Sequence, residues 1–166
     1  MTLADENLLK KVSNLLKEKN LKVATAESCT GGLIAHTLTN ISGSSDYFDR
    51  GIVSYSNKAK TELLGVSQEI IKKYGSVSKQ VVKVMAEGVR LKSNVDIGVA
   101  TTGIAGPTGG TKEKPVGLVF IAISTVQGTY IRRYKFSGNR LQNKELTCNA
   151  ALLMILEHIK NEGDNF

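Results

Sequence analysis

Apolar and polar positions follow helical spacing in three long stretches of the chain. Residues 3–18 carry Leu8, Leu9, Val12, Leu15 and Leu16 at intervals of three and four, which predicts an amphipathic helix that ends at Asn20. Thr2 and Asp5 resemble a capping arrangement for its start. Residues 78–92 and 139–160 predict two further helices, the second with a buried face formed by Leu146, Ala150, Leu153 and Leu156. Shorter helices are expected over 31–40, over 57–65 and from Ser67.

Short apolar runs between these helices predict five strands. Three of them lie at 21–26, 51–55 and 96–102, and each is separated from the next by helical sequence. Runs at 116–125 and 129–136 follow so closely that they predict an antiparallel hairpin. Strands alternating with helices, and then a closing hairpin, predict an α/β fold. We expect a three-layer α/β/α sandwich with a mostly parallel five-stranded mixed sheet, formed by residues 1–166 as one domain.

Composition excludes several classes of protein. With 41% hydrophobic and 22% charged residues among 166, the chain resembles neither a disordered nor a fibrous protein. Cys29 and Cys148 have no C-x-x-C spacing, so we expect free thiols, no metal and no cofactor. No signal-like segment or membrane-length apolar run is present. We therefore expect a cytoplasmic protein with no membrane partner.

The net charge of +7 raises the question of a nucleic-acid partner. The basic residues are spread along the chain and mixed with acids, and no nucleic-acid motif accompanies them. We interpret the excess as a solvated surface together with an anionic small-molecule site, and we do not expect nucleic acid to bind.

The ends of three predicted strands carry the side chains best suited to chemistry. In an open α/β sheet, ligands bind at the carboxyl ends of the parallel strands, which here are 27–30, 55–58 and 101–103. The first end belongs to the turn Thr25–Gly32, rich in hydroxyls and glycine. Such a turn either caps a helix or presents N–H groups to an anion.

Lys60 is the most informative side chain near these strand ends. With Asn57 as N-cap, Lys60 would be the third residue of a helix, where the dipole disfavours a cation. That field, together with burial, would lower its pKa toward that of a general base. The alternative is a solvated lysine, like Lys58. Tyr55 is either a core aromatic or an accessory catalytic group, and Glu27 either orients a partner or caps a helix.

Several motifs together resemble those of the CinA C-terminal domain family. The resemblance covers nearly the whole chain in order and is carried by Thr25-Ala26-Glu27-Ser28-Cys29-Thr30-Gly31-Gly32, Gly43-Ser44-Ser45, Arg50-Gly51-Ile52-Val53-Ser54-Tyr55-Ser56-Asn57-Lys58-Ala59-Lys60, Gly75-Ser76-Val77-Ser78, Thr102-Gly103-Ile104-Ala105-Gly106-Pro107, Gly109-Gly110, Lys114-Pro115-Val116-Gly117 and Phe136-Ser137-Gly138-Asn139-Arg140.

This resemblance implies a nicotinamide-nucleotide amidohydrolase that converts nicotinamide mononucleotide to nicotinate mononucleotide and ammonia in pyridine-nucleotide salvage. It implies a small-molecule pyridine mononucleotide as the partner and a homo-oligomer, dimer or higher. Many members also carry an N-terminal domain with a metal-dependent pyrophosphatase activity. Because Met1 opens the amidohydrolase-like part almost at once, we do not expect that second activity.

The resemblance also implies a serine–lysine mechanism, with Ser28 as nucleophile, Lys60 as base and Tyr55 assisting. Ser28 and Lys60 should then lie within hydrogen-bonding reach or one water apart. The backbone N–H groups of Thr30, Gly31 and Gly32 are candidates for binding either the oxyanion or the 5′-phosphate. The 103–110 loop and Arg140 are competing phosphate sites. The full expected substrate-binding set is Glu27, Cys29, Thr30, Gly31, Gly32, Thr102, Gly103 and Arg140.

Two alternatives stay open at this point. Cys29 or Thr30 could replace Ser28 as the nucleophile. The same crevice could also serve a nucleotide-binding or interaction module that has no catalytic turnover.

Overall fold

The sheet has five strands in the order β2-β1-β3-β4-β5. The computed structural model describes residues 5–161. Strands β1 (Val23–Glu27), β2 (Phe48–Val53) and β3 (Ile97–Gly103) pair in parallel. Strand β4 (Leu118–Thr125) pairs antiparallel with both β3 and β5 (Gly128–Lys135). Four strands therefore share one direction and β4 opposes them, which confirms the mostly parallel mixed sheet.

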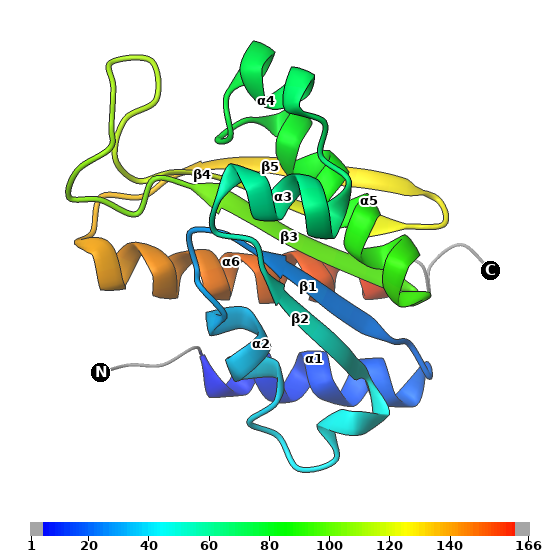
Figure 1. Cartoon of the computed structure of the whole chain (residues 1–166). Coiled ribbons are helices and arrows are strands. Elements are labelled where there is room, and N and C mark those ends of the chain that lie inside the picture. Colours follow the sequence, from blue (N-terminus) through cyan, green and yellow to red (C-terminus); the bar gives the residue numbers. More distant parts are fainter. Residues whose placement is uncertain (1–4, 162–166) are drawn as a thin grey trace.

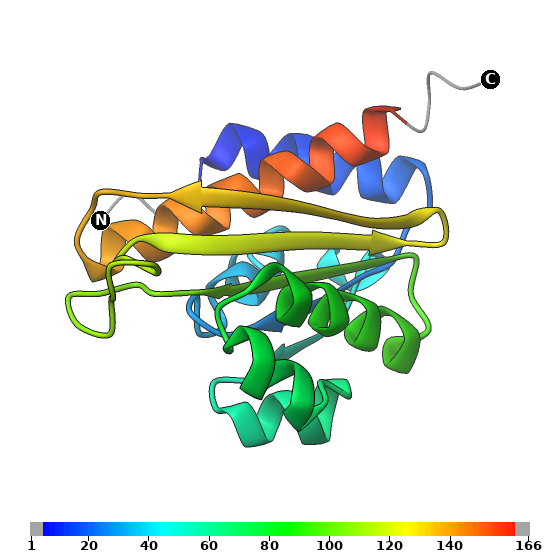
Figure 2. The ribbon, with the colours of Figure 1, turned by 90° about the horizontal axis from the view of Figure 1, so that it is seen from above.

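Helices cover both faces of this sheet and complete the three layers (Figure 1). One face carries α1 (Glu6–Glu18), α2 (Leu33–Leu38) and α6 (Arg140–Asn161). The other carries α3 (Asn57–Leu64), α4 (Gln68–Tyr74) and α5 (Lys79–Ser93), and Figure 2 shows α5 running along the sheet on this side. Within residues 5–161, no helix combines the length and the apolar character needed to cross a membrane.

Small side chains on one face of the strands allow α5 to approach the sheet closely. Because side chains alternate between faces, Val23 packs toward α1 and α6, whereas Ala24 and Ala26 pack toward α5. A Cβ on Gly98 would lie 2.2 Å from the carbonyl oxygen of Ala86 in α5. Glycine is therefore required at position 98 for the helix to lie against β3.

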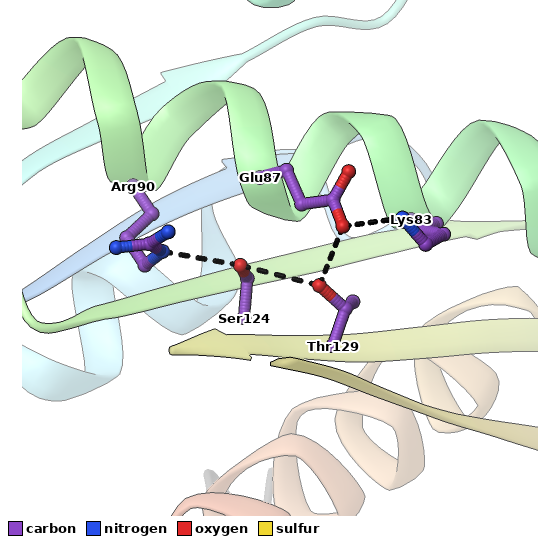
Figure 3. A network of polar contacts seen from close by, with 5 residues as sticks. All are labelled: Lys83, Glu87, Arg90, Ser124 and Thr129. Atoms are coloured by element: carbon purple, nitrogen blue, oxygen red, sulfur yellow. Dashed lines mark hydrogen bonds and ion pairs between the residues drawn. The ribbon is translucent and has the colours of Figure 1, made fainter. Parts of the chain in front are cut away.

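A polar network joins α5 to the β4–β5 hairpin (Figure 3). Arg90 Nε donates to Ser124 Oγ at 3.2 Å, and Thr129 Oγ1 donates to Glu87 Oε1 at 2.8 Å. Burial alone would raise the pKa of Glu87, but hydrogen bonds from Lys83 and Thr129 outweigh it and lower that pKa. The network fixes the position of the hairpin against α5.

The structure corrects three details of the expected elements. α1 begins at Glu6 with Asp5 as its N-cap, whereas Thr2 lies outside the described residues. β2 covers 48–53, so Tyr55 lies beyond its end. α6 differs in the face that it buries.

The expected buried face of α6 is wrong in its rotation about the helix axis. Leu146 and Leu153 are 43% and 42% exposed, although Leu156 is buried. The helix carries apolar residues around much of its circumference, so its pattern fits two faces. The face that packs on the sheet is lined by Cys148, Ala151, Leu152, Ile155 and Ile159.

Candidate active site

A pocket of about 240 Å³ opens at the carboxyl ends of β1, β2 and β3. It brings together residues from all three expected strand ends, from the loop after β3, from the segment before α5 and from the first residue of α6. The lining residues are Ser28, Cys29, Tyr55, Lys60, Ser76, Val77, Thr102, Gly103, Ile104, Ala105, Gly106, Thr108, Gly109 and Arg140.

Ser28 stands directly after β1, at the start of the turn that leads into α2. Its N–H donates to the carbonyl oxygen of Thr101 on β3 at 3.1 Å, so the neighbouring strand fixes its backbone. The residue is 8% exposed and lines the pocket. Its hydroxyl is therefore accessible from the pocket and otherwise enclosed by protein.

Lys60 reaches Ser28 from α3. The N-cap of this helix is Ser56, whose Oγ accepts from the N–H of Ala59, and not Asn57 as expected. Lys60 is consequently the fourth helical residue. Because helical side chains lean toward the N-terminus, its amine lies 3.0 Å from Ser28 Oγ. Lys60 is 2% exposed, so the solvated alternative is wrong.

The surroundings of the Lys60 amine suit its neutral form. Burial lowers the pKa of Lys60 below its usual 10.5. The amine also lies 2.9 Å from the Ser54 carbonyl oxygen and 3.2 Å from that of Tyr55. A neutral amine has two N–H bonds for these two carbonyls and one lone pair left to accept the hydroxyl proton of Ser28. This arrangement can therefore activate the serine as a nucleophile.

Glu27 caps α2 and does not line the pocket, so the helix-capping alternative is the one observed. The residue is 1% exposed. Its carboxylate accepts from the N–H groups of Gly32 at 3.1 Å, Ile34 at 3.1 Å and Ala35 at 2.8 Å. The charge thus satisfies the start of the helix and fixes the turn that carries Ser28.

The expected anion-binding amides of this turn are mostly occupied. Gly32 donates to Glu27, and Gly31 donates to the Ser28 carbonyl oxygen at 3.1 Å. The Thr30 hydroxyl pairs with that of Thr101 at 2.9 Å, and neither Thr30 nor the two glycines line the pocket. Among the described residues of the turn, the N–H groups of Cys29 and Thr30 have no oxygen acceptor. Only Cys29 also lines the pocket.

The Cys29 thiol is poorly suited to nucleophilic attack. Burial raises its pKa to about 12, although a hydrogen bond with Thr101 acts in the opposite direction. The thiolate, which is the reactive form, is therefore scarce at neutral pH. This argues against Cys29 as an alternative to Ser28.

Tyr55 and Arg140 form one wall of the pocket. Tyr55 is 60% exposed, so the expectation of a core aromatic is wrong. Its hydroxyl accepts from Arg140 Nη2 at 2.8 Å, and Arg140 Nη1 donates to the Gly106 carbonyl oxygen at 2.7 Å. The arginine therefore links the start of α6 to the segment after β2 and to the loop after β3.

Sequence reasoning missed Ser76 and Val77 as pocket residues. Thr102 Oγ1 donates to the Ser76 carbonyl oxygen at 2.8 Å, which joins the segment before α5 to the end of β3. α5 runs antiparallel to β3, so its start had to lie at the same edge as the strand ends. Among residues 5–161, no group of three His, Cys, Asp or Glu side chains is arranged to hold a metal ion.

Comparisons with known proteins agree on one family. The model of the CinA C-terminal domain matches residues 5–159. A CinA-like protein of Syntrophus aciditrophicus is 53% identical over 93% of the chain and 37% of the relative. A putative competence-damage inducible protein of Caldicellulosiruptor bescii is 50% identical over 93% of the chain and 38% of the relative. The chain thus spans a little over a third of the length of these curated relatives.

Solved structures of the same family match over nearly their whole length. The competence/damage inducible protein CihA of Agrobacterium tumefaciens superposes with a TM-score of 0.91 at 41% identity, covering 95% of this chain and 98% of that one. A CinA superfamily protein of Escherichia coli superposes with a TM-score of 0.88 at 33% identity, covering 94% and 93%.

Proposed function

Because this chain belongs to the CinA C-terminal domain family, we propose that it hydrolyses the carboxamide of nicotinamide mononucleotide to nicotinate mononucleotide and ammonia. The observation that carries the proposal is the 3.0 Å contact between a buried lysine amine and a serine hydroxyl at the pocket wall. A serine with an adjacent base is the arrangement needed to form an acyl-enzyme.

In the proposed mechanism, Ser28 Oγ attacks the carboxamide carbon while Lys60 Nζ accepts the hydroxyl proton. The tetrahedral intermediate collapses, the C–N bond breaks, and Lys60 returns the proton to the leaving ammonia. Water then attacks the ester carbon, with Lys60 as base, and releases the carboxylate and Ser28. The Cys29 N–H is the turn amide best suited to stabilise the oxyanion, because it borders the pocket and has no oxygen acceptor.

Helix ends at the pocket support an anionic substrate. α3 begins two residues after the pocket residue Tyr55, α5 begins two residues after Val77, and α6 begins at Arg140 itself. Helix N-termini carry partial positive charge, and Arg140 supplies the one guanidinium among the described residues that line this pocket. We propose that the 5′-phosphate lies near Arg140 and the 103–110 loop.

Ammonia release tests the proposal directly. The purified protein, without added metal, should release ammonia from nicotinamide mononucleotide, with weaker turnover of the riboside because it lacks the phosphate. Ser28→Ala should abolish release, whereas Ser42→Ala, at an exposed serine remote from the pocket residues, should not change it. Tight nucleotide binding without ammonia would replace the proposal with a binding module. Full activity in Ser28→Ala would remove the serine mechanism.

A further inference from the structure

A second pocket, of about 290 Å³, lies between the β4–β5 hairpin and the last turns of α6. Figure 2 shows the hairpin running alongside this helix. The residues that line this second pocket include Tyr130, Arg132 and His158, none of which lines the candidate active site. Arg140 and His158 are 18 residues apart on one helix, which at 1.5 Å per residue places their Cα atoms about 27 Å apart.

The lining combines an apolar floor with aromatic rings. Ile123 and Met154 are buried, at 1% and 4% exposure, and form part of the lining. The rings of Tyr130 and His158 lie against each other with centroids 5.2 Å apart, tilted by 46°. That spacing leaves no room between them, so a flat ligand would stack on the outer face of one ring.

The same pocket also contains one positively and one negatively charged side chain. Arg132 Nη1 and Glu157 Oε2 form an ion pair at 2.6 Å. Because each charge is offset by the other, the pair does not favour a phosphate or another strong anion. Arg132 also hydrogen-bonds the Tyr134 side chain. A guanidinium has five N–H bonds, so those that neither contact uses, together with the carboxylate of Glu157, offer donors and an acceptor to a ligand edge that carries both.

We propose that this second pocket binds an uncharged planar heteroaromatic ring whose edge carries both donors and acceptors, as in a carboxamide-substituted pyridine or a nucleobase. The volume of about 290 Å³ is close to the lower end of the range for small-ligand pockets, about 300 Å³, which is enough for a single planar ring. The inference does not depend on the proposed function, because no residue of the serine–lysine site takes part.

Shifts of backbone amide resonances provide the test, with nicotinamide and adenine as probes and the full chain as receptor. We expect either probe to shift Tyr130, Arg132 and His158. Tyr130→Ala should weaken this binding by roughly 5-fold to 150-fold, the range of base stacking on an aromatic side chain. Tyr130→Phe, which keeps the ring, should bind normally. Val126→Ala, at an 84% exposed turn residue outside the pocket, serves as the control.

Three results would overturn the inference. The first is an absence of shifts at millimolar probe. The second is shifts confined to Ser28, Cys29 and Thr102, which would assign the ring to the active site alone. The third is equal affinity for cyclohexanecarboxamide, which has the amide but no aromatic ring. If Tyr130→Ala does not fold, Tyr130→Leu, which keeps an apolar side chain but removes the ring, must show the same weakening. Preference between nicotinamide and adenine would identify which ring is bound.

Discussion

Replacing Lys60 by methionine removes the proposed base while leaving a side chain of similar length. A positioned general base contributes about 10²–10⁴-fold, equivalent to about 3–5 kcal/mol of barrier. The Lys60 amine is the basic group that contacts Ser28 Oγ among the described residues. We therefore expect kcat for ammonia release to fall by at least about 100-fold. The assay is steady-state ammonia release from nicotinamide mononucleotide.

The Lys60→Met variant should still fold. Methionine leaves the Ser54 and Tyr55 carbonyl oxygens without their lysine donor, at about 1–3 kcal/mol for each buried group left unpaired. Removing a buried amine offsets part of this cost. We therefore expect a folded protein with an unfolding free energy within about 3 kcal/mol of the parent, measured by urea denaturation.

Two matched variants distinguish the loss of the general base from the loss of a positive charge. Lys58→Met changes an exposed lysine of the same helix that forms a 3.7 Å ion pair with Glu62, and this variant should keep kcat within about twofold. Lys60→Arg keeps the charge but cannot lose its proton, so it should be as inactive as Lys60→Met. If Lys60→Met keeps more than a tenth of the parent kcat, the proposed role of Lys60 is refuted.

The lowered pKa of Lys60 also predicts that Lys60→Met changes the pH dependence of the unfolding free energy. The unfolded chain holds the lysine proton up to about pH 10.4, whereas the folded protein loses it at lower pH because of burial. Between the two pKa values the unfolded state binds more protons, so stability rises with pH in that window. The burial penalty is fully present below the folded-state pKa. Lys60→Met should lack this rise, and an unchanged pH profile would contradict the buried-amine interpretation.

Three further predictions concern the neighbours of this pair. Cys29→Ser should retain ammonia release. Because burial raises the pKa of the Cys29 thiol to about 12, iodoacetamide should alkylate it at pH 8 at least 100-fold more slowly than free cysteine. Rapid alkylation that abolishes activity would contradict this prediction. Glu27→Gln should lower the unfolding free energy in urea by about 2–4 kcal/mol, because it loses charge-assisted bonds to the start of α2; a loss below about 1 kcal/mol would mean that the cap is dispensable. Arg140→Met should raise KM for the mononucleotide at least 10-fold and leave KM for the riboside nearly unchanged, whereas equal effects on both substrates would argue against a phosphate contact.

Several expectations from the sequence remain predictions. The homo-oligomer, the cytoplasmic location and the absence of a nucleic-acid partner concern contacts and surroundings beyond a single chain. Gel filtration with light scattering would decide the oligomeric state.

The sequence by itself determined the elements, the sheet class and the three strand ends that meet at one edge. These features follow from local periodicity and from the geometry of parallel strands, which any chain with this pattern must obey. The family resemblance carried by the motifs of the turn and of the segment 50–60 also predicted that Ser28 and Lys60 lie within hydrogen-bonding reach, as they do.

Tertiary structure alone decided how each polar group is used. Ser56 and Asn57 are both good N-caps, and only the extended backbone at Ser56 identifies the cap. Glu27 could face a substrate or a helix, and packing of α2 on β1 turned it toward the helix. Likewise, α6 has apolar side chains on more than one face, so contact with the sheet selected the buried one. A hydrogen bond or a buried face depends on what lies opposite it in space, and residues distant in sequence supply that partner.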